Sequence, residues 1–230
     1  MTNNTTQNPR AATVTMPFLI LTVLFCVCLI TANLIEIKTV NIGIATITAG
    51  MAVFPLSYII NDCIVEVYGF RRARLVIWLG FVMNLLFVMV LQLAIILPGA
   101  ESWQHQSSLE NICGSAPRIL GASFLAFVCG SMINAYVMSR MKIASAGKHF
   151  SLRAIASTLL GEGADSVIFF PLAFGGILQA SEIISLIIAQ TLLKTAYETA
   201  ILPITIYAVK RLKKIERTDT YDTGISYKWW

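Results

Sequence analysis

Acidic side chains stand inside the apolar stretches of this sequence. The stretch SYIINDCIVEVYG, residues 57–69, carries Tyr58, Asp62 and Glu66 at intervals of four, so a helix would place all three on one face. A carboxylate in apolar surroundings is costly unless it is paired or accepts hydrogen bonds, and such residues therefore face the protein interior. We expect Asp62 to contact a ligand and Glu66 to form an ordinary ion pair with the arginines at 71–74.

A second acidic group follows about 100 residues later. Thr158, Glu162, Asp165 and Phe169 are spaced by three or four residues, which gathers a hydroxyl, two carboxylates and an aromatic ring on one helical stripe. Two acids one turn apart repel each other. The arrangement predicts that something positive or rich in hydrogen-bond donors lies between them, or that one of them is protonated.

The chemistry of these groups depends on the few bases near them. Lys194 and Glu198 have the spacing of a local ion pair, and that pair and a role at the site are both open. The apolar segments hold five acids against this single lysine. Such an interior favours a ligand that offers several N–H groups or a positive charge, and it would repel an anion. The alternative is protonated acids bonded to the backbone or to Asn84, Asn134 and Ser157.

The elements that carry these residues have the composition of membrane spans. Of 230 residues, 57% are hydrophobic and 13% are charged, against roughly 25% charged in soluble domains. Runs long enough to cross a bilayer lie at 11–35, 39–61, 75–100, 119–139, 154–181 and 183–209. The sequence predicts an all-α polytopic membrane protein with six transmembrane helices over residues 17–209. Residues 1–16 and the basic segment 210–230 are expected to be mobile cytoplasmic tails.

The basic residues predict the orientation. With six spans both termini share a side, and that side holds fourteen Lys and Arg, whereas the opposite side holds Lys38 and Arg118. The positive-inside rule therefore predicts cytoplasmic termini. The net charge of +5 is explained by loops that face lipid headgroups, without a nucleic-acid partner.

Enzyme motifs that would compete with a transport function are missing from the sequence. It contains no P-loop, HExxH, GxSxG or paired CxxC, so we expect no enzyme activity, no cofactor and no metal site. GEGAD at 161–165 is one residue away from the GxGD of intramembrane aspartyl proteases, but the partner Tyr-Asp motif is absent. A non-transporting membrane scaffold is a further alternative, although a scaffold would not need acids in its spans.

Three stretches of this sequence, 57–74, 130–142 and 153–170, resemble the vitamin uptake transporter family, and within it the transporters of queuosine precursors. The resemblance implies a six-helix, multi-pass protein of the cell inner membrane. It implies import of a 7-deazaguanine such as preQ0, preQ1 or queuine for tRNA modification. The alternative within transport is a substrate-binding subunit for another small vitamin that relies on a separate ATPase. Monomer and homo-oligomer are both open.

The resemblance and the spacing together give a set of candidate site residues. The substrate-binding candidates are Glu162, Asp165, Asp62, Asn61, Asn134, Tyr58, Ser157, Thr158, Phe169 and Phe170. Candidates for gating or an ion pair are Glu66, Arg153, Lys194 and Glu198. A 7-deazaguanine offers adjacent N1–H and N2–H₂ donors that one carboxylate can accept together, and its flat ring can stack on an aromatic side chain. Among substitutions of the acids, we expect Glu66→Gln to be the mildest.

Overall fold

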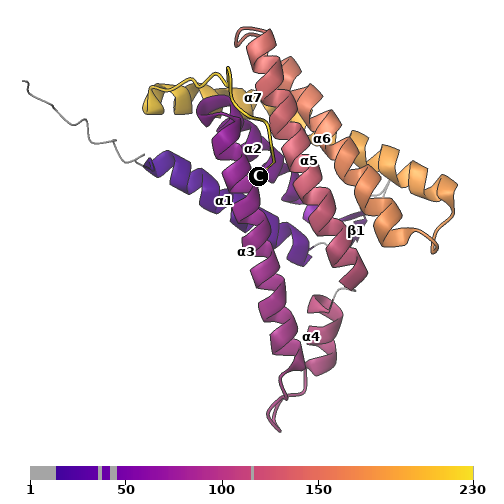
Figure 1. The fold of residues 1–230 in the computed structure, drawn as a ribbon. Helices are drawn as coiled ribbons and strands as arrows, with labels where there is room; N and C mark the ends of the chain where they lie inside the picture. Colours follow the sequence, from indigo (N-terminus) through magenta and orange to yellow (C-terminus); the bar gives the residue numbers. More distant parts are fainter. Residues whose placement is uncertain (1–13, 36–37, 42–45, 115–116, 230) are drawn as a thin grey trace, which may run out of the picture.

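The computed structural model describes residues 14–35, 38–41, 46–114 and 117–229, so most of the predicted N-terminal tail lies outside the described residues. The described chain is mainly α-helical, as predicted. Its elements are α1 (Met16–Ile35), β1 (Thr39–Asn41), β2 (Thr46–Thr48), the 3-10 helix η1 (Ala49–Ala52), α2 (Phe54–Tyr68), α3 (Phe70–Ile96), α4 (Gln106–Cys113), α5 (Pro117–Ala144), α6 (Phe150–Phe174) and α7 (Ala180–Glu216). Figure 1 shows α3 and α5 as long helices, with α4 near the far end of α3.

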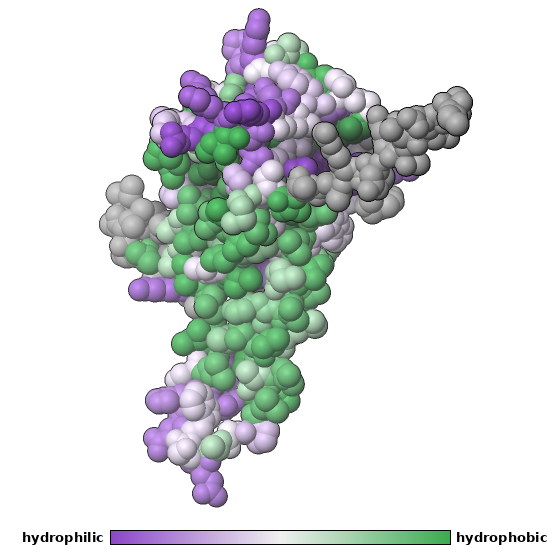
Figure 2. Space-filling model, turned by 90° about the vertical axis from the view of Figure 1, so that its left-hand side faces the viewer, coloured by the Kyte–Doolittle hydropathy of each residue, from purple (hydrophilic) through white to green (hydrophobic). Residues whose placement is uncertain are grey.

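Five helical segments within the described residues are long and apolar enough to cross a membrane: Met16–Ile35, Ala49–Tyr68, Phe70–Ile96, Gly121–Ala144 and Phe150–Phe174. The sixth predicted span, 183–209, lies inside α7, which is not among these five. Figure 2 shows an apolar band around the middle of the molecule, with polar residues gathered at both ends. A multi-pass membrane protein is the class that this surface fits.

The second span differs from the prediction. Within the predicted span 39–61, Thr39–Asn41 and Thr46–Thr48 form the antiparallel pair β1 and β2, and the apolar helical segment covers 49–68 instead. This region is charge-free but rich in β-branched residues, which fit a strand. The shift places Asp62 inside the helical segment, about 5 Å from its middle at 1.5 Å per residue.

Two glycines let α5, α6 and α2 meet closely beside the acidic residues. A Cβ on Gly130 would lie 2.8 Å from the backbone oxygen of Gly161, and a Cβ on Gly161 would lie 2.9 Å from the backbone oxygen of Gly130. Tyr58 of α2 fills the remaining space, with its hydroxyl 2.7 Å from the Cβ position of Gly130. Small residues at helix contacts allow this close approach in membrane proteins. The glycines thus bring Tyr58 and Asp165 next to each other.

The C-terminal segment, residues 217–229, packs onto the helices. Its Asp222 accepts hydrogen bonds from the Phe70 backbone N–H at 2.8 Å and from the Ser139 hydroxyl at 2.5 Å. Gly69 makes room for it, because a Cβ there would lie 2.6 Å from an Asp222 carboxylate oxygen. Figure 1 shows this yellow segment beside α2. The structure therefore differs from the mobile tail expected from the sequence: α7 continues to Glu216, and the segment after it is part of the fold.

Candidate functional site

Apart from Asp222, the charged residues in the interior of the described chain form three groups along the packed helices α2, α6 and α7. Order along α7 separates them: Lys194 belongs to the first group, Glu198 to the second and Lys213 to the third. Along α2 the order is the same, with Phe54 first, then Asp62, then Glu66.

The first group surrounds Lys194. Its ammonium nitrogen lies 2.8 Å from Oε2 of Glu162 and 3.5 Å from Oδ2 of Asp165, so a positive group does lie between the two acids, as their spacing predicted. Lys194 is thus directed at α6. Glu198, the alternative local partner, accepts a hydrogen bond from Thr158 at 2.5 Å instead. The pair of acids carries one compensating positive charge and keeps a net charge of −1 when both are ionised.

A cavity opens beside this group. Four predicted residues line it: Asp165, Phe169, Phe170 and Lys194. Sequence reasoning did not include Asn33, Phe54, Ser123, Ser166 and Gln190, which also line it. Gln190 could have been found, because it lies one helical turn before Lys194 in an otherwise apolar run.

The cavity is compact in this conformation. Its volume of about 90 Å³ is well below the roughly 300 to 1,000 Å³ of ordinary ligand pockets. Lys194 limits the space from one side, with its ammonium nitrogen 4.1 Å from the centre of the Phe54 ring. A planar bicyclic ligand would therefore have to displace a flexible side chain, and Lys194 is the one that binds the cavity acids.

The second group is a buried hydrogen-bond chain across four helices. The Asn61 amide donates to Asn134 at 2.9 Å, and the Asn134 amide is 3.5 Å from the Thr158 hydroxyl, which donates to Glu198. Asp62 lies beside this chain with its carboxyl within hydrogen-bonding reach of Glu198. These residues connect α2, α5, α6 and α7 next to the cavity and do not line it.

Ser157, a further predicted binding residue, points elsewhere. Its hydroxyl donates to the backbone oxygen of Ala154 at 2.9 Å and lies 3.9 Å from the Met138 sulfur. Ser157 is therefore tied to its own helix.

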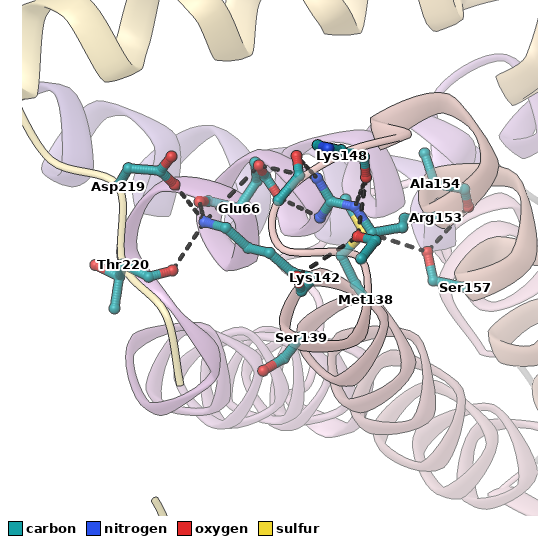
Figure 3. Close-up of polar contacts among 12 residues, drawn as sticks. Glu66, Met138, Ser139, Lys142, Lys148, Arg153, Ala154, Ser157, Asp219 and Thr220 are labelled. Atoms are coloured by element: carbon teal, nitrogen blue, oxygen red, sulfur yellow. Dashed lines mark hydrogen bonds and ion pairs between the residues drawn. The ribbon is translucent and has the colours of Figure 1, made fainter. Parts of the chain in front are cut away.

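The third group is an ion-pair cluster of Glu66, Lys142, Arg153, Lys213 and Asp219, much of which Figure 3 shows. Glu66 accepts from both Arg153 terminal nitrogens, at 2.5 and 3.2 Å, and from Lys213 at 2.6 Å. The predicted ion pair between Glu66 and the arginines at 71–74 is wrong. Gly69, with φ of 84°, breaks the helix between α2 and α3, and Arg72 lies over the rings of Phe18 and Tyr68.

The C-terminal segment completes the ion-pair cluster. Lys142 donates to the Glu66 backbone oxygen at 2.5 Å, to Asp219 at 2.5 Å and to the Thr220 backbone oxygen at 2.8 Å. Burial by itself raises the pKa of Asp219, but hydrogen bonds from Lys142 and Lys213 outweigh it and hold the pKa below its usual value. Sequence reasoning placed Lys142, Lys213 and Asp219 in solvated loops and tails, and missed this cluster.

Comparisons with known proteins fit this arrangement. Residues 48–208 match the family described as "Putative vitamin uptake transporter". The chain is 32% identical over 188 residues to a "Probable queuosine precursor transporter" of Bacillus subtilis, covering 81% of this chain and 82% of that protein. It is 29% identical over 153 residues to the "Queuosine precursor transporter" of Escherichia coli, covering 66% of each chain. No solved structure matches. The match includes the first and second groups and Glu66, Lys142 and Arg153 of the third, and the chain belongs to the vitamin uptake transporter family.

Proposed function

We propose that this protein is a membrane transporter that imports a queuosine precursor, and that Glu162, Asp165 and Lys194 form its substrate site. The family and the names of the relatives support the transport function. The observation that carries the site is that Lys194 of α7 forms ion pairs with Glu162 and Asp165 at the wall of a cavity. Phe169 and Phe170 line the same cavity. The family and the relatives are transporters, so the protein is not an enzyme.

The proposed binding mode uses the cavity acids as acceptors. Asp165 accepts the N1–H and N2–H₂ of a 7-deazaguanine, and Phe169 or Phe170 stacks on the ring. Lys194 leaves Asp165 first, because its contact there is longer than its contact with Glu162. Glu162 then keeps the lysine neutralised while the substrate is bound.

The base edge gives a direct test of this binding mode. We expect guanine to compete with uptake of radiolabelled preQ0 much better than adenine, because adenine has an acceptor at N1 and no N2 amine, and would leave the acid desolvated and unpaired. Uptake in cells that lack their own transporter measures this. Equal competition by adenine and guanine would show that the cavity acids do not read this edge.

We propose six spans in the cell inner membrane, with α7 as the sixth and with both termini cytoplasmic. The ion-pair cluster and the basic loops then lie at the cytoplasmic end, and the cavity lies toward the opposite side. A reporter active only in the cytoplasm, fused after Trp230, is expected to be active. The same site carrying a reporter active only outside the cytoplasm is the matched control, and activity there would overturn the orientation.

The sequence lacks a nucleotide-binding motif of its own, and we propose that transport also needs no separate ATPase. Purified protein in liposomes is expected to equilibrate radiolabelled preQ0 across the bilayer without any nucleotide. Liposomes with the Asp165→Ala variant are the control for leakage. Substrate binding without equilibration, restored by adding a membrane extract with ATP, would make the chain a subunit of a larger transporter.

A further inference from the structure

Asp62 and Glu198 are buried acids for which the described residues provide no cation. The ion pairs of the described residues involve Glu66, Glu162, Asp165 and Asp219, and leave these two acids out. Asp62 is 0% exposed and Glu198 is 2% exposed. Ionised carboxyls in such positions are strongly destabilising unless they are paired.

The two carboxyl groups are close neighbours in the interior. They lie within hydrogen-bonding reach, and Thr158 donates to Oε2 of Glu198. No donor among the described side chains and backbone reaches either oxygen of Asp62 or Oε1 of Glu198 within 3.5 Å, although the neutral Asn134 amide lies close to Asp62. Two carboxylates are acceptors only, so they can bond to each other only when one of them carries a proton.

The charged groups on the surrounding helices do not neutralise Asp62 and Glu198. A bound proton is therefore the remaining way to reduce the negative charge of this pair. On α2 Glu66 lies one turn away, and on α6 Glu162 adds a further negative charge. The nearest cations are committed elsewhere. Lys194 of α7 contacts Glu162 and Asp165, whereas Lys142 of α5, Arg153 of α6 and Lys213 of α7 surround Glu66. Asn134 of α5 accepts from Asn61 through its amide oxygen, and its amide nitrogen, 3.5 Å from the Thr158 hydroxyl and close to Asp62, carries no positive charge.

We propose that Asp62 and Glu198 form a proton-binding site, and that transport moves this proton inward together with the substrate. The inference rests on the proposed function. Asp62 and Glu198 lie between the cavity and the ion-pair cluster in the order of α2 and α7. While the cluster is closed, the dehydrated pair keeps one shared proton, which it takes from the cavity side. When the cluster opens, water stabilises the doubly ionised pair, and the proton leaves to the cytoplasm. One proton enters and one leaves, so the pair returns to its starting state.

The proton itself can be observed without transport. The infrared spectrum of the purified protein at neutral pH is expected to contain a buried carboxylic-acid C=O band that disappears in Asp62→Asn. The asparagine amide has the same shape and can donate to Glu198, so this variant is designed to fold. If Asp62→Asn does not fold, Glu198→Gln tests the same hydrogen bond by changing the other acid. Glu162→Gln is the matched control, since Lys194 neutralises that acid, and it should keep the band. A wild-type spectrum without the band, or a band that survives both Asp62→Asn and Glu198→Gln, would overturn the site.

A pH gradient tests the coupling. Proteoliposomes held one pH unit more acidic outside than inside, at zero membrane potential, are expected to accumulate neutral radiolabelled preQ0 up to about tenfold. Asp62→Asn liposomes should only equilibrate it. If the wild type equilibrates preQ0 and ignores the gradient, the coupling is wrong while the proposed function stands. If the wild type moves no preQ0, the proposed function and the coupling fail together, and the infrared band still decides whether the proton site exists.

Discussion

Substitution of Glu66 by glutamine is expected to lower the free energy of unfolding by about 3 to 5 kcal/mol and to abolish uptake. The glutamine keeps the shape of the side chain but removes the charge that Arg153 and Lys213 bind at 2.5 and 2.6 Å. Lys142 and Lys213 would then share only Asp219, which is partly exposed, and buried Arg153 would lose its ion-pair partner among the described residues. Thermal unfolding in detergent and uptake in cells measure the two effects. The sequence alone suggested the opposite, that this acid would be the most tolerant.

The matched control for Glu66→Gln is Arg71→Gln. Arg71 is exposed and belongs to the basic run that the sequence paired with Glu66. Its loss should leave unfolding unchanged. The predicted cluster would be contradicted if Glu66→Gln unfolded at the wild-type temperature while Arg71→Gln unfolded earlier.

Replacement of Asp165 by alanine is expected to reduce uptake about 100-fold or more while membrane levels stay near normal. Two hydrogen bonds to a charged acceptor are lost at roughly 1.5 to 3 kcal/mol each, which accounts for a reduction of that size. The fold should tolerate the change, because Asp165 lines the cavity and Lys194 keeps Glu162 as its partner at 2.8 Å. Glu162→Gln should weaken uptake less, since the amide oxygen still accepts from Lys194. Radiolabelled uptake, with immunoblots for membrane levels, separates these outcomes.

Ser157→Ala is the control within the same helix. Its hydroxyl bonds to Ala154, so uptake should be close to wild type although the sequence made it a binding candidate. Normal transport by both Asp165→Ala and Glu162→Ala would make the cavity acids structural, and the proposed substrate site would then be wrong.

The sequence predicted the helical membrane class and the need for a positive group between Glu162 and Asp165 because both follow from local properties. Long apolar runs indicate spans, and repulsion between acids one turn apart is present in any helix. The identity of that group was not predictable. Lys194 is spaced correctly for a bond to Glu198, and only the packing of α7 against α6 directs it to the other acids.

Two other differences have a similar cause. The region 39–48 has no charges, and hydropathy does not separate a charge-free strand from a charge-free helix, so the start of the second span was misplaced. The C-terminal segment has no periodic pattern at all. It is held by single contacts over long sequence separations, such as Asp222 with the Phe70 backbone, and these have no local signal.

The ion-pair cluster also has a consequence for how the protein is made. Arg153 comes 87 residues after Glu66 in the sequence, and Lys213 comes 147 residues after it. Both partners are therefore synthesised much later than Glu66. At synthesis rates of roughly 5 to 20 residues per second, Glu66 waits about 7 to 30 s for its last helical partner to be translated. Glu66 is uncompensated until Lys142 and Arg153 are made and incompletely paired until Lys213 follows, so α2 cannot take its final place in the lipid until α5, α6 and α7 have been inserted. Biogenesis should therefore pass through a stage with α2 held at the insertion machinery, and nascent chains that stop before Arg153 should be the ones that membrane quality control removes fastest.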